Sequence, residues 1–271
     1  MINKFLEKTR EGKLTVGTFF EMGHAAVGEV IGQTELDYFI IDCEHGPYDI
    51  ESVGDVIRAA EGVSGGKVTP FARSKDSERA SILKLLDIGA KGIIIPHVQS
   101  LEEAKRIVEY GKYFPVGDRG VAVSRSVKYG LSDETNQGIK TWLEECNEKE
   151  LLIPQCETTG CLNQIEEIMA LDGIDGIFVG PYDLSASLGI PAEFDNLKFL
   201  KAIKRIIKAV KTAGKFAIIY VDDEKTAAER CALGYDSVTI QLDSTVYFRA
   251  LNKMVEEVHE VAEGIITSQE I

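Results

Sequence analysis

The sequence predicts an α/β protein that folds as a single (β/α)₈ barrel, and three observations lead to this prediction. Eight apolar runs rich in β-branched residues alternate with segments of helical period, which is typical of βαβ units with a parallel sheet. The chain has 271 residues, close to the length of one such barrel. Ionisable residues follow the apolar runs, and in this fold the active site lies where the strands end.

Each element is expected from its own pattern of apolar residues. Short continuous apolar runs predict buried strands at 14–20, 38–42, 68–71, 92–96, 151–156, 176–179, 216–221 and 237–242. Apolar residues at three- and four-residue spacing predict helices at 25–32, 50–61, 78–86, 101–110, 163–170, 197–213, 226–233 and 246–264. No linker rich in Pro, Gly or Ser interrupts the series, so residues 1–271 are expected to form one domain.

The segment 113–130 is the one long insertion in this pattern, and it precedes a helical segment expected at 131–146. Long loops in compact domains are usually functional or disordered. The glycines of this segment, together with Arg119 and Arg125, indicate an ordered loop near an anionic ligand or a subunit boundary. A solvated crossover loop is the alternative.

Composition indicates a soluble enzyme and argues against several other classes. The net charge of −14, with acids and bases interspersed, opposes nucleic-acid binding. No apolar stretch approaches the roughly 20 residues of a membrane span, and the charged N-terminus lacks the apolar core of a signal peptide. The five cysteines are scattered, which favours a reduced, cytoplasmic protein without disulfides.

Polar residues at the end of the second expected strand form a candidate catalytic group. Asp42 ends the buried run, and Glu44 and His45 follow two and three residues later. A carboxylate at this place can orient an imidazole and fix which ring nitrogen carries the proton, as general base catalysis requires. The alternative is that Asp42 caps a loop and His45 packs passively.

Two further acids follow the fifth and sixth expected strands. Glu157 and Asp183 each lie just past a strand end, and carboxylates converging from neighbouring strands suit a hard divalent cation such as Mg²⁺ or Mn²⁺. Zinc is less favoured, because no Cys/His cluster has suitable spacing. The alternative is that both acids cap the helices that follow them.

Six sequence blocks together resemble the HpcH/HpaI aldolase family, the metal-dependent class II aldolases that cleave 4-hydroxy-2-oxo acids to pyruvate and an aldehyde. They are IDCEHGP (41–47), PFAR (70–73), LDIGAKG (86–92) with Pro96, YFPVGDRG (113–120), QCE (155–157) and VGPYDLS (179–185). The blocks occur in the family's order, and the likeness extends from about Gly17 to Asp243. The first and last blocks carry most of the signal.

The resemblance implies a divalent metal, Mg²⁺ or Mn²⁺ with Co²⁺ as a further candidate, held by Glu157 and Asp183. It implies that Arg73 binds the keto oxygen and stabilises the enolate. It also implies that His45, oriented by Asp42, moves the proton.

Two further positions are expected to contact the substrate. Gln155 matches a residue that lines the family's substrate pocket, and Tyr182 stands where many members carry a small residue. Both are therefore assigned to substrate binding.

The chemistry supports the same residue types independently. Breaking a C–C bond beside a ketone leaves negative charge on the carbonyl oxygen, which a metal and a guanidinium stabilise, and the 4-hydroxyl needs a base. The competing aldolase chemistry uses a lysine Schiff base. No lysine lies in an expected strand, and Lys75 and Lys225 fall in expected loops, so this mechanism is disfavoured.

Several residues depart from the family pattern, and these departures bear on which aldehyde the enzyme accepts. The eighth expected strand ends in Gln241-Leu242-Asp243, and His97 follows the fourth; their roles stay open. Three functions are therefore weighed: a pyruvate aldolase, a C–C bond-forming enzyme like the family's citrate synthase of siderophore pathways, and a non-catalytic barrel. Retention of both acids, His45 and Arg73 argues against the third.

The last expected helix predicts self-association. Leu251, Met254, Val255, Val258 and Ala262 lie on one face, and a stripe of this kind is rarely left in water. It either covers its own barrel or docks on a neighbour. The resemblance implies the second, with C-terminal helices exchanged between subunits in a homohexamer built as a trimer of dimers, in which the Arg119 loop of one subunit completes the site of another.

Overall fold

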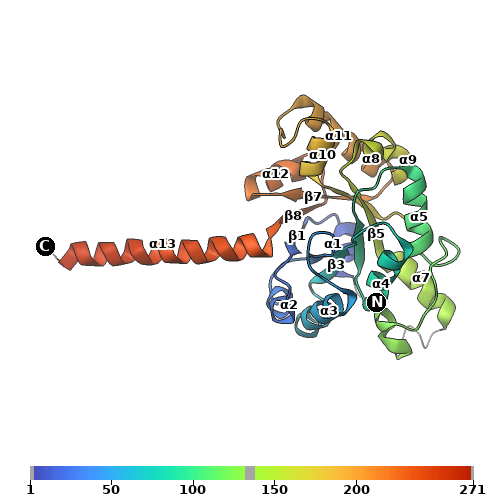
Figure 1. Ribbon diagram of the computed structural model, residues 1–271, viewed down its shortest axis with the longest axis horizontal. Helices are drawn as coiled ribbons and strands as arrows, with labels where there is room; N and C mark the ends of the chain where they lie inside the picture. The colour runs from blue at the N-terminus through green and yellow to red at the C-terminus, as the bar shows by residue number, and fades with distance from the viewer. Residues whose placement is uncertain (1–2, 132–137, 270–271) are drawn as a thin grey trace.

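The computed structural model describes residues 3–131 and 138–269, and its eight parallel strands close into one barrel in chain order (Figure 1). The predicted (β/α)₈ fold is therefore confirmed. The strands are β1 (Thr15–Phe20), β2 (Tyr38–Asp42), β3 (Thr69–Arg73), β4 (Gly92–Ile95), β5 (Leu151–Cys156), β6 (Gly176–Val179), β7 (Phe216–Val221) and β8 (Ser237–Leu242).

Helices surround this barrel in the expected alternation. They are α2 (Ala25–Gly32), α3 (Ile50–Ser64), α4 (Arg79–Ile88), α5 (Leu101–Gly111), α7 (Ile139–Lys149), α8 (Thr159–Asn163), α9 (Ile165–Met169), α10 (Pro181–Ser187), α11 (Leu197–Thr212), α12 (Glu224–Ala232) and α13 (Asp243–Gln269). The helix expected at 131–146 begins later, at Ile139, and residues 132–137 lie outside the described part. The helix expected at 163–170 is shorter and forms α9, preceded by α8.

An N-terminal helix that the periodicity did not predict closes the bottom of the barrel. Helix α1 (Lys4–Arg10) begins with Asn3 as its N-cap, and Phe5 is fully buried. The Phe5 ring makes edge contacts with Tyr38, Phe71 and Phe216 at centroid distances of 4.9–5.2 Å. These aromatic residues fill the barrel interior, so the open end lies at the carboxyl ends of the strands.

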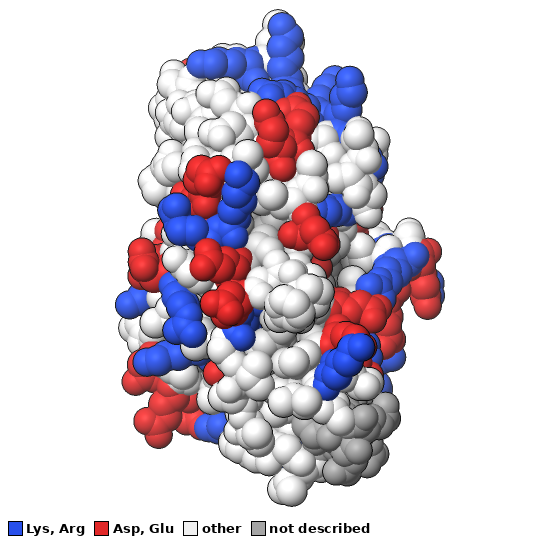
Figure 2. Space-filling model, turned by 90° about the vertical axis from the view of Figure 1, so that its right-hand side faces the viewer, with Lys and Arg blue, Asp and Glu red and all other residues white. Residues whose placement is uncertain are grey.

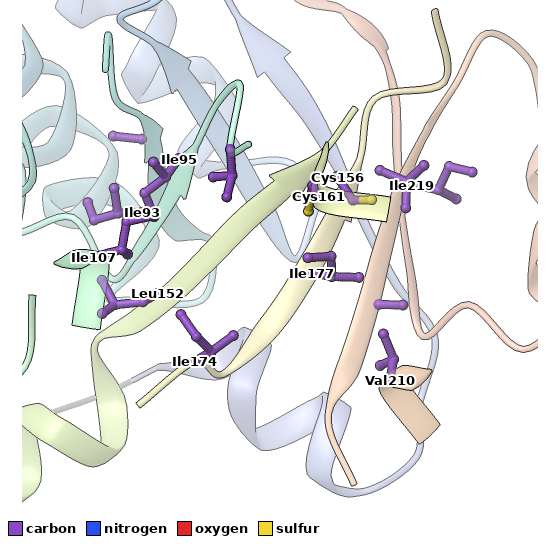
Figure 3. Packing of buried hydrophobic residues seen from close by; sticks show 14 of the residues in the cluster. Ile93, Ile95, Ile107, Leu152, Cys156, Cys161, Ile174, Ile177, Val210 and Ile219 are labelled. Carbon is purple, nitrogen blue, oxygen red and sulfur yellow. The ribbon is translucent and has the colours of Figure 1, made fainter. Parts of the chain in front are cut away.

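A second apolar layer joins the outside of the strands to the helices. Figure 3 shows Ile93 and Ile95 of β4, Leu152 of β5 and Ile177 of β6 pointing away from the barrel axis, toward residues such as Ile107 of α5. Neighbouring strand positions such as Ile94 and Ile153 belong to the interior cluster instead. This two-residue alternation fixes which residues reach the mouth of the barrel.

The pairing between β8 and β1 is irregular near the mouth. Gly17 pairs with Thr239, but Phe19 pairs with Leu242, so β8 carries an extra residue. Gln241 lies in this bulge with a φ of 57°, a backbone region that favours glycine. Bulges bend a strand and redirect the chain. Here the chain passes from Leu242 directly into α13.

Helix α13 leaves the barrel and extends away from it along most of its length (Figure 1). Its exposed apolar residues include the expected stripe Leu251, Met254, Val255 and Val258. Helix α12, which precedes α13 in the chain, has no fully buried residue, so α13 does not cover it. The structure therefore rules out the first alternative for the stripe, that α13 covers its own barrel.

The segment 113–130 is ordered, with a short 3₁₀ helix at Arg125–Gly130, but Arg119 does not face an anionic ligand. Its guanidinium is buried and pairs with Glu150 and, at 2.9 Å, with Asp87. Its carbon Cζ lies 4.5 Å from the centroid of Tyr113. Because Glu150 precedes β5, this pairing lies at the end of the barrel opposite the mouth. Carboxylates of the chain already neutralise Arg119, which argues against the anionic ligand at this residue; the subunit boundary stays a prediction.

The molecular surface carries charges of both signs, as the composition predicted. Figure 2 shows acidic and basic side chains interspersed over one face, with uncharged areas between them. Several form exposed ion pairs, such as Arg205 with Glu166. Within residues 3–131 and 138–269, no helix is long and apolar enough to cross a bilayer.

Candidate active site

Strand pairing brings Asp42 and Arg73 together at the mouth of the barrel. The two residues are register partners at the ends of β2 and β3. Arg73 Nε donates to Asp42 Oδ1 at 2.8 Å and Nη2 donates to Oδ2 at 2.6 Å. Asp42 is fully buried and Arg73 is 9% exposed. This bidentate pair fixes the plane of the guanidinium.

The Asp42–Arg73 pair differs from the His–Asp pair that the sequence predicted. Asp42 Oδ1 accepts backbone N–H groups of Glu44 and His45, but its side-chain partner is Arg73. The His45 imidazole is exposed, and its Nε2 lies 3.7 Å from Glu44 Oε2. Sequence spacing placed the acid near His45 correctly, but it did not reveal that an arginine on the next strand would occupy both carboxylate oxygens.

Glu44 joins this group from the loop after β2. Its Oε2 lies 3.3 Å from Arg73 Nε and is closer to that nitrogen than to His45. Burial raises the pKa of Glu44, which the charges of Arg73 and His45 partly oppose. The sequence motif contained this residue, but no spacing rule distinguished it from a loop acid.

Glu157 is held firmly at the end of β5. Its Oε1 accepts the backbone N–H of His97 at 2.6 Å, and its Oε2 accepts the side-chain amide of Gln155. Only 4% of Glu157 is exposed. Burial raises its pKa, and the carboxylates of Glu44 and Asp183 raise it further. Thr158, not Glu157, is the N-cap of α8, so the capping alternative for Glu157 was wrong.

Asp183 lies in the first turn of α10, with Gly180 at the N-cap position and no side-chain capping bond there. The capping alternative for Asp183 was therefore also wrong. Its charge raises the pKa of both Glu157 and Glu44. The three carboxylates thus lie within electrostatic reach of one another, beside Arg73.

This donor set fits a hard divalent cation. Within the described ranges no three Asp, Glu, His or Cys side chains converge to hold an ion by themselves, but Mg²⁺ is commonly bound through one or two carboxylates plus substrate oxygens and waters. A Cβ added to Gly180 would lie 2.8 Å from Glu157 Oε2, so the glycine keeps the space beside that carboxylate open. The Oε1 atom of Gln155 is buried there without a protein partner.

Tyr182 and Asp222 form a second polar group on the β6–β7 side. Tyr182 Oη donates to Asp222 Oδ2 at 2.8 Å, and Tyr182 is 47% exposed. Gln241 Nε2 donates to the carbonyl of Asp222 at 3.0 Å. Asp243 Oδ1 and Oδ2 accept the backbone N–H groups of Glu21 and Met22. The structure therefore gives Gln241 and Asp243 local roles in shaping the mouth.

His24 and Trp142 have structural roles, and two lysines near the strand ends lie in loops. His24 caps α2, because its Nδ1 accepts the N–H of Ala26 at 3.1 Å. Trp142 is buried against Tyr113. The candidate Schiff-base lysines Lys75 and Lys225 are exposed in loops. The placement of the two lysines agrees with the loops that the sequence predicted.

Comparison with known proteins identifies the group to which this site belongs. The model of the HpcH/HpaI aldolase/citrate lyase family matches residues 15–250. The chain belongs to the HpcH/HpaI aldolase/citrate lyase family. Among its relatives, the 2-keto-3-deoxy-L-rhamnonate aldolase of Escherichia coli (strain K12) is 30% identical over 253 residues, which cover 93% of this chain and 91% of the relative.

Two solved structures share this barrel. An HpcH/HpaI aldolase from Desulfitobacterium hafniense DCB-2 is 27% identical, with a TM-score of 0.84 over 94% of this chain and 96% of that one. The citrate synthase SbnG is 26% identical, with a TM-score of 0.82 over 95% and 98%. The chain is thus a carbon–carbon lyase, and the alternative of a non-catalytic barrel was wrong.

Proposed function

We propose that the protein is a divalent-metal-dependent aldolase that reversibly cleaves a 4-hydroxy-2-oxo acid to an aldehyde and pyruvate or a close 2-oxo acid. The observation that carries this proposal is the grouping of a fixed guanidinium, Arg73, with the carboxylates of Glu157 and Asp183 at the ends of three strands. A 2-oxo acid placed between them meets a cation on one side and oxygen ligands for a metal on the other.

In this proposal Glu157 and Asp183 hold the metal, which is Mg²⁺ or Mn²⁺, with Co²⁺ as a further candidate. Burial raises the pKa of Glu157, and the like charges of Glu44 and Asp183 raise it further; a nearby cation relieves this repulsion. When bound, the metal supplies a Lewis acid that polarises the keto group of the substrate. Gln155 keeps Glu157 oriented and offers its free Oε1 toward the substrate pocket.

Arg73 stabilises the enolate that forms when the C3–C4 bond breaks. Its contacts with Asp42 and Glu44 use Nε and Nη2, and in this proposal its Nη1 edge donates to the keto oxygen. Asp42 is a positioning residue for this guanidinium. A fixed donor aimed at developing negative charge lowers the barrier without reorganisation.

His45 acts as the general base in the cleavage direction. It takes the proton of the substrate's 4-hydroxyl as the C3–C4 bond breaks and the aldehyde forms. Its imidazole is exposed at the mouth, with Nε2 3.7 Å from Glu44 Oε2. Tyr182 contacts the part of the substrate that becomes the aldehyde.

A C–C bond-forming synthase on the same scaffold is the second candidate, because the citrate synthase SbnG shares the fold and 26% of the sequence. Such an enzyme would join a 2-oxo acid and an acyl thioester. The grouping of Arg73 with the two carboxylates serves either reaction, so the distinction rests on the second substrate.

We also infer an exchanged C-terminal helix and a hexameric assembly built as a trimer of dimers. The exposed apolar stripe of α13 supports this, since leaving such a surface in water is unfavourable. The Arg119 loop would then lie near a subunit boundary. A cytoplasmic location is inferred from the five cysteines, all of which are free.

A pyruvate-release assay tests the proposed function. The purified protein is incubated with Mn²⁺ and a panel of 4-hydroxy-2-oxo acids, including 2-keto-3-deoxy-L-rhamnonate, and pyruvate is measured with a coupled dehydrogenase. Oxaloacetate with acetyl-CoA forms the second arm. Pyruvate release in the first arm supports the aldolase, whereas thiol release confined to the second arm supports the synthase.

A further inference from the structure

Acids also follow the strands on the side of the barrel mouth formed by β7, β8 and β1. Arg73, which faces the 2-oxo acid in the proposed function, lies at the end of β3. The ends of β7, β8 and β1 carry Asp222, Asp243 and Glu21. Burial raises the pKa of Glu21, and the charges of Asp42 and Asp243 raise it further, as expected where anions crowd. Lys225, which follows β7, is exposed at the start of α12, beside Asp223.

A row of aromatic rings connects the reacting centre to this acidic side. The Arg73 guanidinium lies over Phe19, with Cζ 4.7 Å from the ring centroid. Phe19 contacts Tyr220 at 6.0 Å, and Tyr220 contacts Tyr182 at 6.3 Å, between centroids. Tyr182 ends the row with its hydrogen bond to Asp222. A substrate that extends from Arg73 along this row therefore reaches the Asp222 carboxylate.

Asp222 is distinct from its neighbour Asp223, although the sequence presents them as a pair. Asp223 caps α12, since its carboxylate accepts both the N–H and the hydroxyl of Thr226. The carboxylate of Asp222 accepts the hydroxyl of Tyr182 on Oδ2 and also lies beside the hydroxyl of Tyr220, and its backbone carbonyl accepts the amide of Gln241. Because an ionised carboxylate has about four lone-pair sites, Asp222 can accept a further hydrogen bond from a ligand beside these two tyrosines.

We propose that Asp222, together with Tyr182, selects the aldehyde half of the substrate, favouring short uncharged aldehydes that carry a hydroxyl group and rejecting aldehydes that carry a carboxylate. This inference rests on the proposed aldolase function. A hydroxyl can donate to the Asp222 carboxylate or to Tyr182 Oη, which a saturated alkyl group cannot do. A carboxylate at the same place meets a like charge with no arginine or lysine in the aromatic row to pair with it.

The test measures aldol addition of pyruvate to two matched pairs of acceptors. Glycolaldehyde and glyoxylate differ by a carboxylate in place of a hydroxymethyl group, and L-lactaldehyde and propanal differ by one hydroxyl. The kcat/KM ratio within each pair is determined for the wild type, for Asp222→Asn and for Glu224→Gln. Asparagine can keep a hydrogen bond to Tyr182, and Glu224 is an exposed acid two residues away that serves as a control for charge.

Wild-type protein is expected to prefer glycolaldehyde and L-lactaldehyde. Asp222→Asn should shift the glycolaldehyde-to-glyoxylate ratio toward glyoxylate by at least about fivefold, the scale of one partly screened unit-charge interaction. Glu224→Gln should leave the ratio close to that of the wild type. Rising salt concentration should bring the glycolaldehyde-to-glyoxylate ratio of kcat/KM closer to one, and this change should be larger in the wild type than in Asp222→Asn.

A wild-type preference for glyoxylate, or a ratio that Asp222→Asn does not move, would overturn the inference. Deuterium exchange at the methyl group of pyruvate, measured on the wild type without any aldehyde, tests the donor half separately. Absence of exchange counts against the proposed function itself. Exchange together with no discrimination between acceptors counts only against the role of Asp222.

Discussion

The backbone nitrogen of His97, just past β4, donates a 2.6 Å hydrogen bond to Glu157 Oε1 at the end of β5. His97 adopts a φ of 54°, a left-handed conformation that costs a non-glycine residue roughly 1–2 kcal/mol. Strained backbone of this kind concentrates at functional sites. Here it directs an N–H group at a buried carboxylate, and so helps to keep Glu157 ionised and in place.

Replacing His97 with glycine should therefore stabilise the fold without removing this hydrogen bond. Relief of the left-handed strain, less the entropy cost of glycine, predicts a gain of about 0.5–1 kcal/mol in the free energy of unfolding. Urea unfolding of His97→Gly and His97→Ala checks this, because alanine removes the imidazole but retains the strain. Equal stabilities of the two variants would mean that the backbone conformation carries no cost.

Asp42 should make the free energy of unfolding of the protein depend on pH at acidic pH. Burial alone raises the pKa of Asp42, but the hydrogen bonds and charge of Arg73 outweigh it, so the net pKa lies below the usual 3.8. A carboxyl group whose pKa is lowered by folding stabilises the native state when the pH lies above the pKa that the group has in the unfolded chain. This contribution is lost as the pH falls from there through the lower pKa of the folded state.

Asp42→Asn should accordingly cost roughly 3 kcal/mol at pH 7, because it leaves a buried guanidinium short of its main counter-charge. The difference from the wild type should stay constant between about pH 5 and 7 and shrink below about pH 4. Urea titrations across this range provide the measurement. A difference that grows as the pH falls would have the wrong sign for this ion pair.

His45 and Arg73 should both be required for cleavage, for different reasons. His45→Ala removes the proposed base and should slow turnover by about 10²–10⁴-fold. Arg73→Lys keeps the charge but cannot form the bidentate pair with Asp42 and donate to the substrate at once, so kcat should fall while the protein remains folded. Steady-state kinetics with circular dichroism check both variants. Near-normal turnover in either would remove that residue from the mechanism.

Helix α13 should drive assembly. Light scattering at micromolar concentration is expected to give the mass of a hexamer, and deletion from Val246 onward should abolish it. Leu251→Glu combined with Val255→Glu charges the apolar stripe, whereas Asn252→Glu places a charge beside it on the same exposed helix. We expect the first variant to dissociate and the second to assemble. A fully active wild-type monomer would contradict the exchanged-helix proposal.

Local patterns predicted the barrel because each strand and most helices satisfy their own apolar periodicity. The run ending at Asp42, for example, is buried along its whole length. The same patterns placed Glu157 and Asp183 after neighbouring strands, since strand ends follow directly from strand positions.

Contacts between side chains distant in the sequence were not predictable in this way. The pairing of Arg73 with Asp42 depends on the register of β2 and β3, and Phe5 of α1 closes the barrel through contacts with residues of three strands. The bulge at Gln241 depends on the mismatch between β8 and β1. Arg119 was misjudged because burial against Glu150 is invisible in a loop sequence.

Metal dependence through Glu157 and Asp183 is the central claim, and chelation tests it most directly. Protein treated with EDTA and returned to metal-free buffer is assayed for pyruvate release from a 4-hydroxy-2-oxo acid, before and after addition of Mn²⁺, alongside Glu157→Gln and Asp183→Asn. We predict that activity disappears on chelation, returns with Mn²⁺ in the wild type, and stays absent in both folded variants. Full activity of the chelated wild type in metal-free buffer would contradict the account.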